Sequence, residues 1–102
     1  MYPKLVRDKI PDIIVNDGKT VICRKAVDNK EYIEYLNKKL LEEVNEYLDG
    51  NNIEELIDIL EVVYSIANVN DISKVNLEND RRYKEFQYGN FNNRYIIEEV
   101  KE

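Results

Sequence analysis

Two pairs of acidic residues are candidates for chemistry because each pair is spaced three residues apart in a segment of helical periodicity. Glu43 and Glu46 form the first pair, and Glu55 and Asp58 form the second. Residues at this spacing lie on one face of a helix, so two helices packed antiparallel across a turn near Gly50 would bring both pairs together. Four converging carboxylates would repel one another without a cation, and oxygen ligands suit hard ions such as magnesium. The spacing therefore makes these four residues candidate metal ligands.

The same residues also have a simpler interpretation, because acidic side chains on helices are most often ordinary solvent-exposed charges. Glu55 has a further structural explanation. If Asn52 caps the second helix, Glu55 stands at the third helical position, where its side chain can accept a hydrogen bond from the Asn52 N–H. The spacing alone leaves open whether Glu55 is a metal ligand or part of a helix cap.

Apolar periodicity and capping residues predict the helix that would carry the first acidic pair. Asp28 followed three residues later by Glu31 predicts a helix start with a reciprocal cap. The helix should run to about Asp49, with Gly50 just beyond its end. On the helical projection Glu43 lies at the edge of the apolar face, beside the core rather than opposite it.

The second helix should begin after Asn52 and run to about Asn68. It is apolar around most of its circumference, which indicates burial on several sides. Glu55 falls among these apolar residues, and a carboxylate there should be paired, neutralised or bound to a metal. Because one chain of this length cannot cover such a helix, we expect a homodimer or homotetramer with residues 53–69 at or near the interface.

Shorter elements are expected in the rest of the chain. Residues 10–15 are predicted to form a short helix, and residues 72–86 a third main helix capped by Asp71. Residues 20–27 and 94–100 are β-prone and are predicted as two strands that pair. The predicted fold class is therefore mainly α, a small bundle of two long antiparallel helices plus a third, with a minor two-stranded β element, in a single domain spanning all 102 residues.

The composition excludes several classes of function. A formal net charge of −6 argues against binding to a nucleic-acid polymer through phosphate neutralisation. There is no histidine, which excludes histidine-based catalysis and histidine-containing zinc sites, and the single cysteine, Cys23, cannot form a disulfide within the chain. No apolar stretch is long enough to cross a bilayer and the first residues do not form a secretory signal, so we expect a cytoplasmic protein without a membrane partner.

Three segments together resemble a known superfamily. The helix-pair motif Lys39-Leu-Leu-Glu-Glu43-Val-Asn-Glu46, followed by Glu54-Glu55-Leu-Ile-Asp58, resembles the Glu-x-x-Glu…Glu-x-x-Asp pattern of the all-α nucleotide pyrophosphohydrolases, which include MazG-like proteins and phosphoribosyl-ATP pyrophosphohydrolase. The opening Lys4-Leu-Val-Arg-Asp-Lys-Ile-Pro11 is similar to the N-terminus of small MazG-like members. Lys84 and Gly89-Asn-Phe91…Arg94 resemble the Lys…Arg-Gly-Gly-Phe segment of that group, without its basic residue and second glycine.

The resemblance implies magnesium-dependent hydrolysis, with manganese as an alternative ion, of a nucleoside triphosphate or related nucleotide to the monophosphate and pyrophosphate. Glu43, Glu46, Glu55 and Asp58 would hold the metal, which could lower the pKa of a water that attacks the α-phosphorus. Glu43 or Glu46 would orient that water. The alternatives are phosphoribosyl-ATP pyrophosphohydrolase activity and a non-catalytic helical interaction module that keeps the fold.

Further residues are candidates for contacts to the nucleotide substrate. Basic residues of the flanking segments could contact its phosphates: Arg7, Lys9, Lys84 and Arg94. Lys39 could do the same, although an i, i+4 salt bridge to Glu43 explains it equally well. Asn68, with Tyr64 nearby, could contact the base or ribose, or could serve only in packing and capping.

Overall fold

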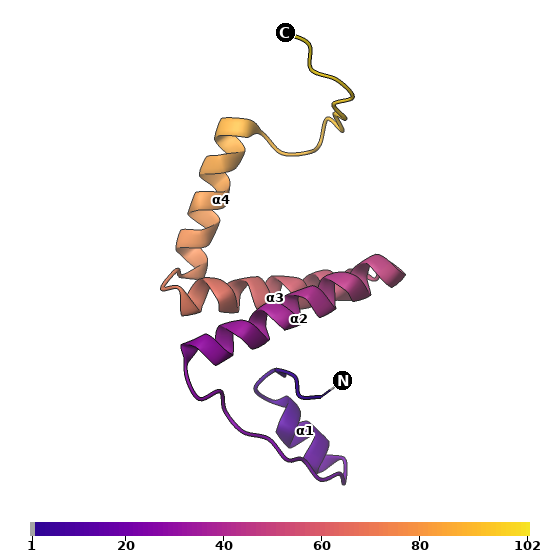
Figure 1. Ribbon diagram of the computed structural model, residues 1–102, viewed down its shortest axis with the longest axis vertical. Coiled ribbons are helices and arrows are strands. Elements are labelled where there is room, and N and C mark those ends of the chain that lie inside the picture. The colour runs from indigo at the N-terminus through magenta and orange to yellow at the C-terminus, as the bar shows by residue number, and fades with distance from the viewer. Residues whose placement is uncertain (1) are drawn as a thin grey trace.

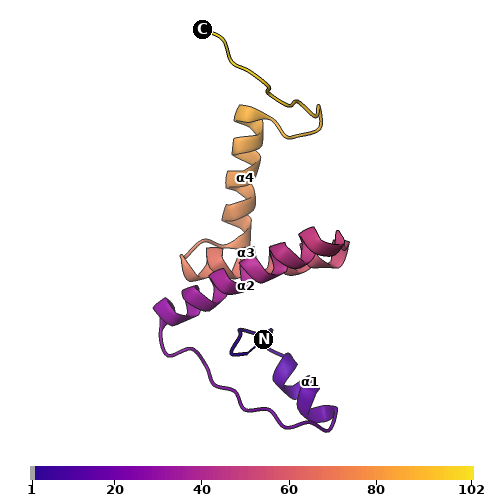
Figure 2. The same ribbon diagram turned by 45° about the vertical axis from the view of Figure 1, so that its right-hand side comes forward.

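The computed structural model of the chain describes residues 2–102, and it is mainly α-helical, as the sequence predicts. Its four helices follow one another as α1 (Ile10–Asn16), α2 (Asn29–Gly50), α3 (Ile53–Val69) and α4 (Lys74–Tyr88) (Figure 1). The two longest, α2 and α3, run antiparallel side by side (Figures 1 and 2). Within the described residues, none of these helices combines the length and the apolar character that a membrane span needs.

The start of α2 is fixed by the cap that its sequence predicts. Asp28 Oδ1 accepts a hydrogen bond from the Glu31 N–H at 2.9 Å. In return Glu31 Oε1 accepts from the N–H of Val27 at 3.0 Å, one residue earlier than in the usual reciprocal cap. Arg24 holds the same carboxylate through hydrogen bonds of 2.6 and 3.0 Å. The first turn of α2 is thereby tied to the extended segment that precedes it.

The turn between α2 and α3 is made by two asparagines. α2 continues through Gly50, one residue further than predicted, and Asn51 takes the left-handed conformation, with φ 53°. The Asn51 N–H donates to the carbonyl oxygen of Tyr47, which closes the last turn of α2. Asn52 then caps α3, because its side chain accepts from the Glu54 N–H at 3.0 Å. This short turn places the two acidic pairs on neighbouring helices.

The core between α2 and α3 is small. Among the residues that the structure describes, the buried apolar side chains are those of Leu36, Val62 and Ala67, and the buried charged one is that of Glu43. A protein interior normally surrounds each core residue with many neighbours. Here, much of the apolar surface of both helices faces outward.

α4 begins two residues later than predicted and leaves the helix pair at a steep angle (Figures 1 and 2). Ser73 is its cap, with Oγ accepting from the Asn76 N–H at 3.1 Å, whereas the predicted cap, Asp71, takes a left-handed conformation with φ 61°. The molecule is consequently elongated. Its radius of gyration is 18.0 Å, against about 13 Å for a compact domain of this length.

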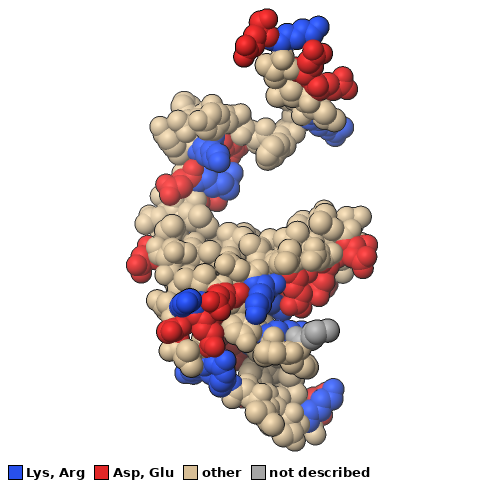
Figure 3. Space-filling model, viewed as in Figure 1, with Lys and Arg blue, Asp and Glu red and all other residues tan. Residues whose placement is uncertain are grey.

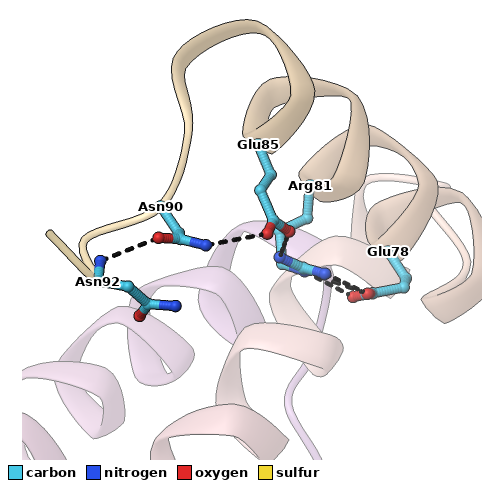
Figure 4. Close-up of polar contacts among 5 residues, drawn as sticks. All are labelled: Glu78, Arg81, Glu85, Asn90 and Asn92. Carbon is cyan, nitrogen blue, oxygen red and sulfur yellow. Dashed lines mark hydrogen bonds and ion pairs between the residues drawn. The ribbon is translucent and has the colours of Figure 1, made fainter.

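A polar network joins α4 to the segment that follows it (Figure 4). Arg81 lies between two carboxylates of its own helix and donates to Glu78 at 2.6 Å and to Glu85 at 2.9 Å. Asn90 donates to Glu85 at 3.3 Å, and its side-chain oxygen accepts from the Asn92 N–H at 2.9 Å. These bonds fix the direction in which the chain leaves α4.

The prediction of a two-stranded β element is wrong for the described part of the chain. Residues 20–27 and 94–100 are not in strand conformation there, and they lie at opposite ends of the molecule (Figures 1 and 2). β-propensity describes how well a side chain fits a pleated, half-buried surface, so it has little effect without a neighbouring strand. The orientation of α4 keeps these two segments apart.

Candidate metal centre

Three of the four predicted ligands meet across the contact between α2 and α3. One carboxylate oxygen from each of Glu43, Glu55 and Asp58 lies within 4.8 Å of the other two. Glu43 also belongs to a second group on α2, in which it meets Glu42 and Glu46 within the same distance. The two groups share Glu43, so the structure brings five carboxylates to one edge of the helix pair. Figure 3 shows acidic side chains along this edge, toward the turn between α2 and α3.

Glu42 is an addition to the predicted set. It directly precedes Glu43 in the Glu-Glu-x-x-Glu stretch. The sequence could have identified Glu42 as a member of the cluster, because Glu42 and Lys39 are three residues apart and therefore share a face of α2. The spacing of three residues between acidic side chains indicated Glu43 and Glu46 but not Glu42.

Burial separates Glu43 from an ordinary surface carboxylate. Its side chain is only 7% exposed, and its Oε2 atom is buried without a hydrogen-bond partner. Glu55 Oε2 is in the same condition. A buried polar atom without a hydrogen-bond partner costs free energy, and it costs more when it belongs to a charged group. Two such oxygens beside a third carboxylate fit a hard divalent cation, which prefers oxygen ligands.

The structure also bears on the alternative role of Glu55 as a helix cap. The Asn52 side chain is bonded to the N–H of Glu54, and the N–H of Glu55 donates to the Asn52 carbonyl oxygen at 3.1 Å. Within residues 2–102, no hydrogen bond joins the Glu55 side chain to the Asn52 N–H. The carboxylate of Glu55 is instead directed toward Glu43.

Basic side chains offset part of this negative charge. Lys39 Nζ lies 3.3 Å from Glu43 Oε1 and 3.8 Å from Glu42 Oε1, so the salt bridge foreseen as one of its two roles is present. Lys4 reaches Glu42 at 3.9 Å. A hollow of about 270 Å³ opens beside these lysines and is also lined by Tyr35. The hollow places positive and aromatic groups next to the carboxylates.

Arg7 is paired with a predicted metal ligand. Its Nη2 atom donates to Asp58 Oδ1 at 2.7 Å. Both side chains remain partly in solvent, with 50% of Arg7 and 40% of Asp58 exposed. Arg7 was predicted as a phosphate contact, and its position beside Asp58 puts it at the edge of the carboxylate cluster.

The close approach of the carboxylates perturbs their protonation. The pKa of Glu55 is raised to about 7 by the hydrogen bond that its protonated form can make with Glu43, then by burial, and then by the charge of Glu46. Burial raises the pKa of Glu43, but its interactions with Glu55 and with the Lys39 cation outweigh burial, so the net shift of the pKa is downward. Glu43 is therefore the more acidic member of the pair, and Glu55 retains its proton to a higher pH.

The other predicted substrate contacts are not gathered at this cluster. Lys9 is an exposed residue at the start of α1. Lys84 lies on α4 and Arg94 in the segment beyond it, both of which project away from the helix pair (Figure 1). Asn68 and Tyr64 line a separate hollow of about 190 Å³, where Lys74 Nζ lies 4.9 Å from the centroid of the Tyr64 ring.

Comparisons with known proteins give no relative for this chain. No family model matches it, no curated protein is significantly similar in sequence, and no solved structure is significantly similar in fold.

Proposed function

We propose that this chain is a magnesium-dependent nucleotide pyrophosphohydrolase, which cleaves a nucleoside triphosphate or related nucleotide to the monophosphate and pyrophosphate. The observation that carries the proposal is the buried carboxylate of Glu43, with an unpartnered oxygen, beside Glu55 and Asp58. The order of these acids on two antiparallel helices supports it, since it follows the superfamily pattern described above.

In the proposed site, Glu43, Glu55 and Asp58 hold the cation from both helices. Glu46 is the fourth proposed ligand and approaches Glu43 on α2. When bound, magnesium or manganese would neutralise the substrate's phosphate charge and make a water more acidic. Lys39 fixes the direction of the Glu43 carboxylate through its salt bridge. Glu46 is exposed and is the carboxylate best able to orient water from the solvent side.

Basic groups at the rim would contact the phosphates. Arg7 and Lys4 lie at the edge of the cluster through their pairs with Asp58 and Glu42. A triphosphate carries enough negative charge to compete with Asp58 for Arg7 and with Glu42 for Lys4.

The test is a screen for pyrophosphate release across ribonucleoside triphosphates, deoxyribonucleoside triphosphates and phosphoribosyl-ATP, each with and without magnesium or manganese. The proposal predicts metal-dependent release from at least one substrate. Glu43→Gln should lose it, while Glu34→Gln, an exposed position on the same helix, should keep it. Release from phosphoribosyl-ATP alone would identify the alternative pyrophosphohydrolase activity. No release from any substrate with either metal would contradict the proposal and favour a non-catalytic helical module.

A further inference from the structure

The C-terminal part of the chain, residues 74–102, projects from the helix pair and is called the arm. It consists of α4 and the segment that follows it. α4 contacts α3 but, within the described residues, neither α2 nor α1. Both ribbon views show the arm extending away from the helix pair, with its final segment farthest out (Figures 1 and 2).

The arm exposes large apolar side chains, which are unfavourable on a helix that is surrounded by solvent. On α4, Val75, Tyr83 and Phe86 are 69%, 64% and 89% exposed. At 100° per residue these three fall within an arc of about 80°, so they form one apolar face. Beyond α4, Ile96 and Ile97 are 85% and 79% exposed. The arm thus offers an apolar surface that no other part of residues 2–102 covers.

The helix pair has an unpartnered apolar surface of its own. Four residues of α3 share an arc of about 100° and are between 41% and 66% exposed: Ile53, Leu56, Ile57 and Leu60. We call these four residues the α3 stripe. Exposed apolar surface of this extent marks an interaction site.

The total exposed area shows how much surface is left uncovered. The chain exposes 9578 Å², which is about 3,500 Å² more than a compact protein of this mass would expose. Standard protein interfaces bury about 800 Å² on each partner, and obligate ones bury considerably more. The excess on each chain therefore matches a large, obligate interface rather than a transient contact.

Charge distinguishes between the surfaces that could meet. The helix pair, residues 29–69, carries ten acidic and three basic side chains, whereas the arm carries six of each. Two helix pairs facing each other would bring together two strongly negative surfaces, which is unfavourable. An arm against a helix pair avoids this repulsion, and it brings basic residues of the arm toward the acidic pair of helices.

From these surfaces we infer that the protein is a homodimer in which the arm of each copy packs on the α3 stripe of the other copy. Reciprocal exchange of an identical element gives a closed two-fold dimer, because both contacts are the same. It covers both apolar surfaces at once. It also carries Lys84 and Arg94 onto the helix pair of the partner copy. This inference does not depend on the reaction proposed for the carboxylates.

The test uses the full chain with the photo-crosslinking residue p-benzoylphenylalanine in place of Phe86. This position is exposed and aromatic, so the replacement should not disturb folding. Copies labelled with nitrogen-15 are mixed with unlabelled copies under conditions that allow exchange, irradiated, and analysed by mass spectrometry. The same residue in place of Asp80, an exposed position outside the apolar face of α4, is the matched control.

We expect a dimer by light scattering, and crosslinks from position 86 to residues 53–60 that join labelled to unlabelled chains. Position 80 should give at least several-fold fewer of them. Three results would overturn the inference. Crosslinks to residues 53–60 within a single chain would show that the arm folds back. A dimer crosslinked at position 86 only to the partner's arm would show that a different surface is shared. A monomer at micromolar concentration would exclude exchange altogether.

Discussion

Glu43 and Glu55 bring carboxylate oxygens from two antiparallel helices to within 4.8 Å of each other, and each carboxylate has a buried oxygen without a hydrogen-bond partner. Two acids in this relationship cannot both ionise without cost, because like charges at short range disfavour each other. Either a proton or a cation removes that cost. A proton and a cation therefore have different and measurable effects on stability.

Magnesium should stabilise the protein beyond any effect of ionic strength. A ligand that binds only the folded state at about ten times its Kd adds roughly 1.4 kcal/mol, which corresponds to several degrees in Tm for a domain of this size. The measurement is thermal unfolding in magnesium chloride against sodium chloride of matched ionic strength. Equal shifts in the two salts would indicate ordinary surface carboxylates instead.

Stability in the absence of metal should fall as pH rises from about 4.5 to about 7 on account of Glu55. Its pKa is raised to about 7 in the folded state from an ordinary value of 4.5, so in that interval the folded protein binds a proton that the unfolded chain has lost. Above about 7 the folded carboxylate must ionise beside Glu43, and the destabilisation is complete.

The variant Glu55→Gln isolates this effect, because it removes the titrating group. Relative to wild type, its free energy of unfolding should increase from pH 5 to about pH 7 and then level off by pH 8, as measured by urea denaturation. Comparing the two proteins at each pH cancels the contributions of groups that make stability rise with pH. Glu31 is such a group, because its pKa is lowered to about 2, mainly by its hydrogen bond with Arg24. A constant difference across this range would mean that Glu55 titrates normally.

Arg7 should compete with the metal for Asp58. Removing it by Arg7→Gln should lower metal-free stability by less than about 1 kcal/mol, since both partners of this ion pair are partly exposed. The affinity for magnesium, measured by calorimetry, should rise, because Asp58 is then free of its cation. Lys19→Gln is the control: Lys19 pairs with Asp17 and lies outside the cluster. An unchanged affinity in Arg7→Gln would mean that Asp58 takes no part in holding the ion.

The sequence predicted the two main helices well because their signals are local. Asp28 and Asn52 are capping residues that act within three positions of themselves, and the acidic spacing then follows from helical geometry. The start of α4 was misplaced because Asp71 and Ser73 are both good caps, and only the left-handed conformation of Asp71 decides between them. The helical class was therefore predictable, whereas one boundary depended on the backbone conformation of the loop.

Features that depend on distant segments were less predictable. The expected strands at residues 20–27 and 94–100 failed because pairing needs a neighbour, and the direction of α4 cannot be read from a local pattern. Arg7 is predicted as a phosphate contact from its segment, but its bond to Asp58 joins residues 51 positions apart and has no local signal. The burial of Glu43 likewise results from the packing of α2 on α3.

Glu55 is the proposed ligand whose role is tested most directly, by measuring magnesium binding to Glu55→Gln and to Glu54→Gln. Glutamine is nearly the same size as glutamate but is a neutral and weaker ligand for a hard cation. Glu54 is exposed and adjacent, so it provides a matched control. Calorimetric titration with magnesium should show binding to wild type and Glu54→Gln, and affinity at least tenfold weaker for Glu55→Gln, with the folded state retained. Equal affinity in the two variants would contradict the proposed metal centre.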